Sequence, residues 1–151
     1  MNRKLKVLFK ERGDVIHSVS GSMPLKEAVD LMNQHHIGAL MVINVGGEIE
    51  GIFTERDVMK KLANTDETVG HLPVREIMTP AEKVISTTGD ESINDIMKLL
   101  TDNKIRHVPI VSQEGVLEGI LSIRDVVRML LKEARQKEKT LTDYISGTYP
   151  A

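Results

Sequence analysis

Two short stretches of the sequence carry the same hydrogen-bonding and charged side chains in the same order. They are residues 51–57 (Gly-Ile-Phe-Thr-Glu-Arg-Asp) and residues 119–125 (Gly-Ile-Leu-Ser-Ile-Arg-Asp), and they lie 68 residues apart. In each stretch an apolar strand is expected to end at the hydroxyl residue, where a helix begins. The free backbone N–H groups of that helix N-terminus then lie beside a hydroxyl, a guanidinium and a carboxylate. Phosphate and ribose both suit such a place, so the two motifs predict nucleotide binding.

Helix capping alone would account for part of this pattern. In each motif the hydroxyl residue and the aspartate have the spacing of a capping box. Capping does not require the arginine, because its side chain has no acceptor and a helix N-terminus favours anions. An arginine can donate two hydrogen bonds to a phosphate, and a carboxylate can accept from both hydroxyls of a ribose. We therefore predict nucleotide contacts at six motif residues: Thr54, Arg56, Asp57, Ser122, Arg124 and Asp125.

The repeat extends well beyond the two motifs. At the same offset of 68 residues, apolar positions align between residues 15–63 and residues 83–131, which indicates a duplicated supersecondary unit. Periodicity predicts the order β-α-β-β-α in each unit. A unit of about 49 residues is near the size at which a single core is marginal. The two units should therefore pack on each other, with pseudo-two-fold symmetry, as one α/β (α+β) domain.

The expected strands and helices follow from this alignment. In the first unit we predict strands at 15–19, 39–43 and 51–53, with helices that begin at Leu25 and Thr54. In the second unit we predict strands at 84–86 and 107–111, and a helix that Ser92 caps. Pro109 has no N–H group, which predicts a strand edge or an irregularity at that position.

The repeat also divides the chain into three expected parts. These are residues 1–69, the first repeat with an N-terminal helix and the linker; residues 70–131, the second repeat; and residues 132–151, a C-terminal helical extension. Residues 74–78 in the linker can form one helical turn, and residues 5–9 are its expected counterpart in front of the first unit. Gly147 is expected to end the last helix.

Composition excludes several classes of function. With 40% hydrophobic and 28% charged residues, the chain can form a globular core. A net charge of −2 gives no basic field for a nucleic-acid backbone, so no nucleic-acid partner is expected. The chain has no cysteine, which excludes disulfides and fits a cytoplasmic location. The sequence contains no apolar run long enough for a membrane segment to be expected, and its histidines do not have the spacing of metal ligands.

With these motifs, the sequence resembles the CBS-domain family, named after cystathionine β-synthase, in its stand-alone tandem-pair form, also called a Bateman module. Residues 51–57 and 119–125 match the family pattern Gly-apolar-apolar-Ser/Thr-x-x-Asp, and residues 36–40, 105–109 and 74–79 support the match. The resemblance implies clefts between the repeats that bind AMP, ADP, ATP, NAD(H) or S-adenosylmethionine. It also implies a homodimer that regulates a partner protein. Ribose and phosphate are expected at the Ser/Thr and Asp of the motifs.

The adenine base is expected to lie between aliphatic side chains, because the chain has only two Phe, two Tyr and no Trp. The resemblance places further base or phosphate contacts at strand ends, where ordinary backbone polarity is the alternative interpretation. These candidates are Ser18, Val19, Gly38, Ala39, Ser86, Thr87, Arg106, His107 and Pro109.

The sequence therefore favours a regulatory protein over an enzyme. It contains no cysteine nucleophile, no Gly-x-Ser-x-Gly, no His-Glu-x-x-His and no Walker loop, so no catalytic residue and no catalytic cofactor are expected. Two alternatives remain open: an assembly module whose sites hold no ligand, and an uncharacterised enzyme on the same scaffold. For the homodimer, we expect contacts through helix faces such as Val58 with Leu62 and Val126 with Leu130.

Overall fold

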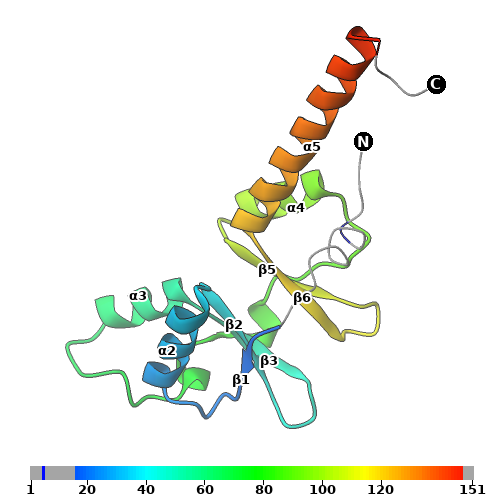
Figure 1. Cartoon of the computed structure of the whole chain (residues 1–151). Coiled ribbons are helices and arrows are strands. Elements are labelled where there is room, and N and C mark those ends of the chain that lie inside the picture. The colour runs from blue at the N-terminus through cyan, green and yellow to red at the C-terminus, as the bar shows by residue number, and fades with distance from the viewer. Residues whose placement is uncertain (1–4, 6–15, 148–151) are drawn as a thin grey trace.

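Two similar α/β units follow one another along the chain and lie side by side (Figure 1). The structure is a computed structural model that describes residue 5 and residues 16–147. The first unit consists of β1 (Ser18–Val19), α2 (Leu25–His35), β2 (Ala39–Ile43), β3 (Ile49–Thr54) and α3 (Glu55–Ala63). The second consists of α4 (Ile93–Asp102), β5 (His107–Val111), β6 (Leu117–Ser122) and α5 (Ile123–Ile145). The linker adds η1 (Val74–Glu76), β4 (Thr79–Pro80) and η2 (Ala81–Lys83).

Each unit is built on an antiparallel hairpin that ends at a motif. The β2–β3 register pairs Ala39 with Thr54, and the β5–β6 register pairs His107 with Ser122. The turns place Gly47 at φ 81° and Gly115 at φ 82°, a left-handed conformation that glycine adopts without steric cost. The two consecutive strands predicted in each unit thus form a hairpin, and each motif hydroxyl lies opposite the first residue of the preceding strand. In the first unit β1 runs parallel to β2, and β4 pairs with β3.

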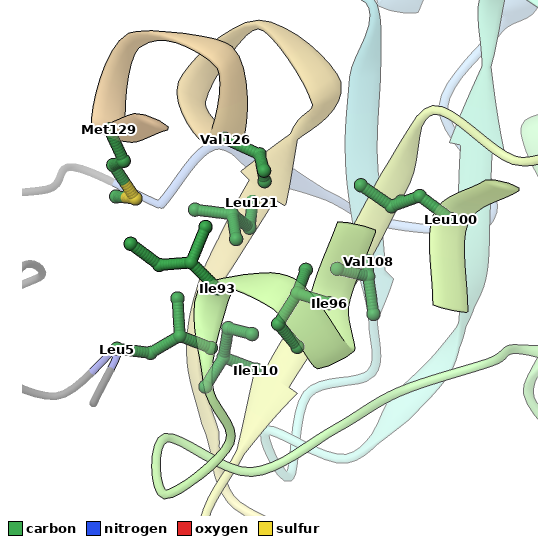
Figure 2. Packing of buried hydrophobic residues seen from close by; sticks show 9 residues of the cluster. All are labelled: Leu5, Ile93, Ile96, Leu100, Val108, Ile110, Leu121, Val126 and Met129. Atoms are coloured by element: carbon green, nitrogen blue, oxygen red, sulfur yellow. The ribbon is translucent and has the colours of Figure 1, made fainter. Parts of the chain in front are cut away.

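Each hairpin packs its helices over a separate core. Leu25, Ala28 and Met32, at positions i, i+3 and i+7, are buried on one face of α2. In the second unit the core is made of residues from α4, α5 and both strands, and Figure 2 shows them with Leu5 at the edge of the cluster, near Ile93 and Ile110. Leu5 thus packs on the second unit, whereas Val74 of the linker packs on the first.

The two units meet through the outer faces of their hairpins. Ala39, Met41 and Ile52 of the first unit are buried in a cluster that includes Leu117 and Ile120 of the second. Both faces of β2 are covered, which explains why its sequence is apolar without alternation. The expected packing of two repeats into one mixed α/β domain is confirmed.

The strand predicted at residues 84–86 is not present, and that prediction is wrong. Only Thr87 forms a bridge to Ile110. In the first unit the N–H of Met41 donates to the carbonyl of His17 at 3.2 Å. The residue 68 positions after Met41 is Pro109, which has no N–H to donate, so the equivalent ladder cannot form. The first strand is also shorter than predicted, since β1 contains only Ser18–Val19, and residue 15 lies outside the described residues.

The last helix, α5, extends well beyond the second unit (Figure 1). It contains 23 residues and ends before Gly147, which has φ 71°. α5 thus continues through residues 132–145, where a helical extension was expected, and Gly147 follows its C-cap. None of the helices in the described ranges combines the length and apolar character needed to cross a lipid bilayer.

Candidate functional site

Both motifs form the predicted capping boxes. In the first motif the backbone N–H of Thr54 donates to Asp57 Oδ2 at 2.8 Å, and Thr54 Oγ1 accepts from the N–H of Asp57 at 3.4 Å. In the second motif Ser122 and Asp125 form the same two bonds at 2.8 and 3.2 Å. The local structure of the two helix N-termini is therefore the same. Any difference in function between the two motifs must therefore come from the residues that surround them.

A cavity of about 820 Å³ lies between the two units, at the second motif. The first unit contributes the loop and strand start at Gly38 and Ala39, together with one side of α2. The second unit contributes the start of β5 and the first turns of α5. Seven of the predicted site residues line this cleft: Gly38, Ala39, Arg106, His107, Ser122, Arg124 and Asp125.

The other eight predicted residues do not line the cleft. These are Thr54, Arg56, Asp57, Ser18, Val19, Ser86, Thr87 and Pro109. In the sequence, Gly38 and Ala39 belong to the same repeat unit as the first motif. The structure instead brings Gly38 and Ala39 of the first unit to Ser122 and Asp125 of the second. Alignment of the two repeats could not show that residues of one unit lie at the motif of the other, because this depends on how the two hairpins pack.

The cleft has an apolar part and a charged part. Ile16, Val29, Met32, Ile37 and Ile120 supply aliphatic surface. Such surface can cover a flat base in the absence of an aromatic side chain. The charged lining consists of three arginines and two carboxylates, and three histidines add polar surface: Arg106, Arg124, Arg128, Glu55, Asp125, His17, His36 and His107. The excess of fixed positive charge over carboxylate favours an anionic ligand.

Sequence reasoning missed two charged residues of the cleft, Arg128 and Glu55. Arg128 follows Arg124 by four residues on α5, and side chains with this spacing lie on one helix face. This four-residue spacing was the signal in the sequence that could have identified Arg128 as a cleft residue. Glu55 is the first residue of α3, and its N–H donates to the carbonyl of Gly38 at 3.1 Å. The sequence carried no signal for Glu55, because the matching residue of the second motif is Ile123.

Gly38 permits a close approach between the two units. A Cβ atom at Gly38 would overlap the carboxylate of Glu55 and would lie 3.2 Å from Cε1 of His107. The carboxylate of the first unit and the imidazole of the second therefore meet over a residue without a side chain. Burial lowers the pKa of His107, and Arg106 lowers it further, against the opposing effects of Glu55 and Asp125. The imidazole is thus neutral over a wider pH range than an exposed histidine.

A second histidine lies in the wall of the cleft. The rings of His17 and His35 have centroids 4.1 Å apart. Burial, followed by the neighbouring His35, lowers the pKa of His17. Within the described ranges, no group of three or more metal-ligating side chains is placed to hold a metal ion.

The first motif makes contacts that hold the fold together. Nη1 of Arg56 donates to the carbonyl oxygen of Lys104 at 2.8 Å, which links α3 of the first unit to the end of α4 in the second. The second oxygen of Asp57 accepts from Thr79 Oγ1 of the linker at 3.3 Å. Arg56 was predicted to contact phosphate, but in this structure it is bonded to the backbone outside the cleft.

Comparison with known proteins agrees with this architecture. The model of the CBS domain matches residues 12–64 and again residues 74–132. CBS domain-containing protein CBSX3, mitochondrial, of Arabidopsis thaliana is 38% identical over 125 residues, which are 82% of this chain. The chain spans only 60% of the length of that relative.

Solved structures show the same fold. The CBS-domain containing protein ATU1752 of Agrobacterium tumefaciens is 31% identical, with a TM-score of 0.78 over 84% of this chain and 98% of that one. The CBS domain pair of protein MJ0100, in complex with 5′-methylthioadenosine and S-adenosyl-L-methionine, is 25% identical. Its TM-score is 0.67 over 76% of this chain and 91% of that one. The chain described here belongs to the CBS-domain family and contains a tandem pair of its domains.

Proposed function

We propose that this protein is a regulatory CBS pair that binds an adenosine-containing ligand in the cleft between its two units and catalyses no reaction. The observation that carries this proposal is the composition of the cleft. It combines aliphatic surface, a motif carboxylate and several cationic side chains, contributed by both units. The adenosine compounds bound by the related pair of MJ0100 support the ligand class.

Each part of the ligand has a matching part of the cleft. We assign the ribose hydroxyls to Asp125, whose carboxylate also caps α5. We assign phosphate to Arg124 and Arg128, because guanidinium groups donate paired hydrogen bonds to phosphate oxygens. Aliphatic side chains such as Ile16 and Ile120 would cover the base. An adenine nucleotide uses all three parts, so AMP, ADP and ATP are the first candidates, ahead of S-adenosylmethionine with its sulfonium charge.

The regulatory step follows from the position of the cleft. A ligand that contacts both units favours one relative orientation of the units over others, by an amount typical of allosteric coupling, about 1–3 kcal/mol. A partner protein would then bind one orientation more tightly. We propose a cytoplasmic location for this process, in line with a chain that contains no cysteine.

We also propose that the protein is a homodimer. Large apolar side chains are exposed on the two helices that follow the motifs: Met59 and Leu62 on α3, and Val127 and Leu131 on α5. Leu62 was one of the residues expected at a dimer contact. Val126, which was also expected there, is fully buried in its own unit, so the sequence-based choice of that residue was wrong.

Thermal unfolding with AMP, ADP, ATP, NADH and S-adenosylmethionine tests the function. A ligand at about 100 times its dissociation constant stabilises the folded state by about 2.7 kcal/mol. For a chain of 151 residues, this raises the unfolding midpoint by several degrees. If no compound shifts the midpoint, the ligand-free assembly module is the better account. Turnover of a nucleotide by the pure protein would support an enzyme instead.

A further inference from the structure

The exposed face of α5 carries a regularly spaced stripe, apolar at five of its six positions, whose residues do not line the cleft. Alternating steps of four and three residues connect its members: Val127, Leu131, Ala134, Glu138, Leu141 and Ile145. This is the spacing of the a and d positions of a heptad repeat. Val127, Leu131, Leu141 and Ile145 are 43%, 53%, 61% and 77% exposed. Val126 and Met129, on the other side of the helix, are buried in the core of their own unit.

The helix also extends beyond the rest of the second unit that the structure describes. A helix of 23 residues is about 34 Å long at 1.5 Å per residue. Its last turns extend past the rest of the second unit (Figure 1). Residues 132–145 of α5 are rich in charged side chains. A helix of this length is only marginally stable by itself in water, and most helices in proteins are stabilised by packing. A partner surface on the stripe would supply this packing.

We infer that the stripe packs against the same stripe of a second copy of this chain, with the two α5 helices antiparallel. This inference rests on the homodimer proposed above and names its surface and register. The register places Val127 opposite the partner's Ile145, and Leu131 opposite the partner's Leu141. Large apolar residues thus face large apolar residues at both ends of the pair. In the middle, Ala134 leaves space for the partner's Glu138.

Charge decides between the antiparallel and the parallel arrangement. A parallel pair in register would place Glu138 against its own copy in the seam between the helices, where two carboxylates repel each other. In the antiparallel register Glu138 instead lies opposite the partner's Ala134 and beside the partner's Arg135, an oppositely charged neighbour. The two-fold axis repeats this contact, so the pair gains two such ion pairs. One polar residue in such a seam is a known way to fix register.

The arrangement also brings the partner close to the cleft. Arg124 and Arg128 lie at the start of α5 and line the cleft. In the antiparallel register this end of α5 lies beside the C-terminal end of the partner's α5. The second copy therefore reaches the side of the cleft to which we assign phosphate, and ligand binding and dimer formation would be linked.

Cysteine cross-linking tests the register, because the natural chain contains no cysteine. The double variant Leu131→Cys/Leu141→Cys, oxidised without nucleotide, should form a covalent dimer as the main species on a non-reducing gel. Each single variant should remain mostly monomeric on the same gel, because residues 131 and 141 each face the other position. The variant Gln136→Cys is the matched control. It lies level with its own copy at the centre of the register, but on the outer face of the helix, so it should not cross-link.

The possible outcomes separate this inference from the proposals on which it rests. Efficient cross-linking of either single variant would overturn the antiparallel register. A double variant that fails to cross-link, although light scattering of the parent protein gives a dimer mass, would show that the dimer uses another surface. A monomer mass for the parent overturns the inference and the homodimer together. A loss of nucleotide binding leaves the cross-linking result unchanged, because the experiment uses no nucleotide.

Discussion

The two motifs of this protein have the same local structure and different surroundings. Arg56 of the first motif donates to the carbonyl of Lys104 and so links the two units. Arg124, at the same position of the second motif, lines the cleft and has no hydrogen-bond partner among the described residues. Lys104 and His36 are also equivalent, since each follows a helix and has a positive φ, 53° and 54°. His36 and Arg124 both line the cleft, but no hydrogen bond between them equivalent to that of Arg56 and Lys104 is present among the described residues.

This difference shows that a repeated motif can keep its capping role while its other side chains serve separate purposes. Capping depends only on residues three positions apart, so both copies retain it. The arginine reaches outside its own turn, so its role depends on the packing of the two units. We therefore expect the first motif to contribute mainly to stability and the second mainly to ligand affinity.

The largest expected effect is the change in AMP affinity when the two motif aspartates are replaced. Asp125→Ala should lower the affinity for AMP by roughly a hundredfold or more, because it removes the acceptor for two ribose hydroxyls and each charged hydrogen bond contributes about 1.5–3 kcal/mol. Asp57→Ala is the matched control, since both variants lose the same capping-box bond from the N-cap N–H to the aspartate while the N-cap hydroxyl residue remains. Calorimetric titration measures the affinities. Equal losses of affinity in the two variants would contradict the division of roles.

Replacing the two motif arginines should have the next largest effect. Arg124→Ala should weaken AMP binding about tenfold or more and leave adenosine binding unchanged, because only AMP carries a phosphate. Arg56→Ala should leave AMP affinity near that of the parent. It should lower the free energy of unfolding by about 1 kcal/mol, since an exposed hydrogen bond between the units is lost. An AMP affinity that falls equally in both variants would restore the phosphate role first predicted for Arg56.

A smaller effect is expected at the close approach between the units. Gly38→Ala adds a methyl group where Glu55 and His107 lie, so the carboxylate must move within the cleft. AMP affinity should fall by about 1 kcal/mol, roughly fivefold, a modest cost for an overpacked position. Gly70→Ala is the control, because its Cβ would only reach an ordinary contact distance of 3.4 Å from Lys26. If Gly38→Ala binds AMP like the control does, the approach of Glu55 does not shape the binding site.

The smallest expected effect is a dependence of stability on pH. Burial lowers the pKa of His107 in the folded protein, so the unfolded chain binds a proton more readily. Stability from this group is present above the unfolded pKa of about 6.5 and decreases as the pH falls through that value. Denaturant unfolding of His107→Gln should show a weaker decrease than the parent between about pH 7 and pH 5.5. The pKa of His17 is lowered as well, but His17 is present in both proteins and cannot cause a difference between them. If the free energy of unfolding depends on pH equally in the variant and the parent, His107 does not contribute to this dependence.

Much of this fold could be predicted from the sequence, because it depends on local patterns. The strand Ala39–Ile43, the cap at Ser92 and the helix beginning after Thr54 all follow from periodicity and capping rules. The failed prediction at residues 84–86 has a local cause as well. The missing N–H of Pro109 was recognised in the sequence, but its consequence for the neighbouring strand was not drawn.

The cleft could be predicted only in part. The second motif, Arg106 and His107 were found because they lie close together along the chain and strand ends carry free polar groups. The contribution of Gly38 and Ala39 to the second motif depends on long-range packing between the hairpins, which a single sequence does not encode in any short pattern. Glu55 was missed for the same reason, since its carboxylate reaches the cleft across Gly38.

A crystal structure of the protein with AMP tests the central claim most directly. We expect AMP in the cleft between the units, with its ribose hydroxyls on Asp125 and its phosphate on Arg124 and Arg128. Arg56 should keep its hydrogen bond to Lys104 in the same crystal. AMP bound at Thr54 and Asp57 alone, with the cleft at the second motif empty, would contradict the account.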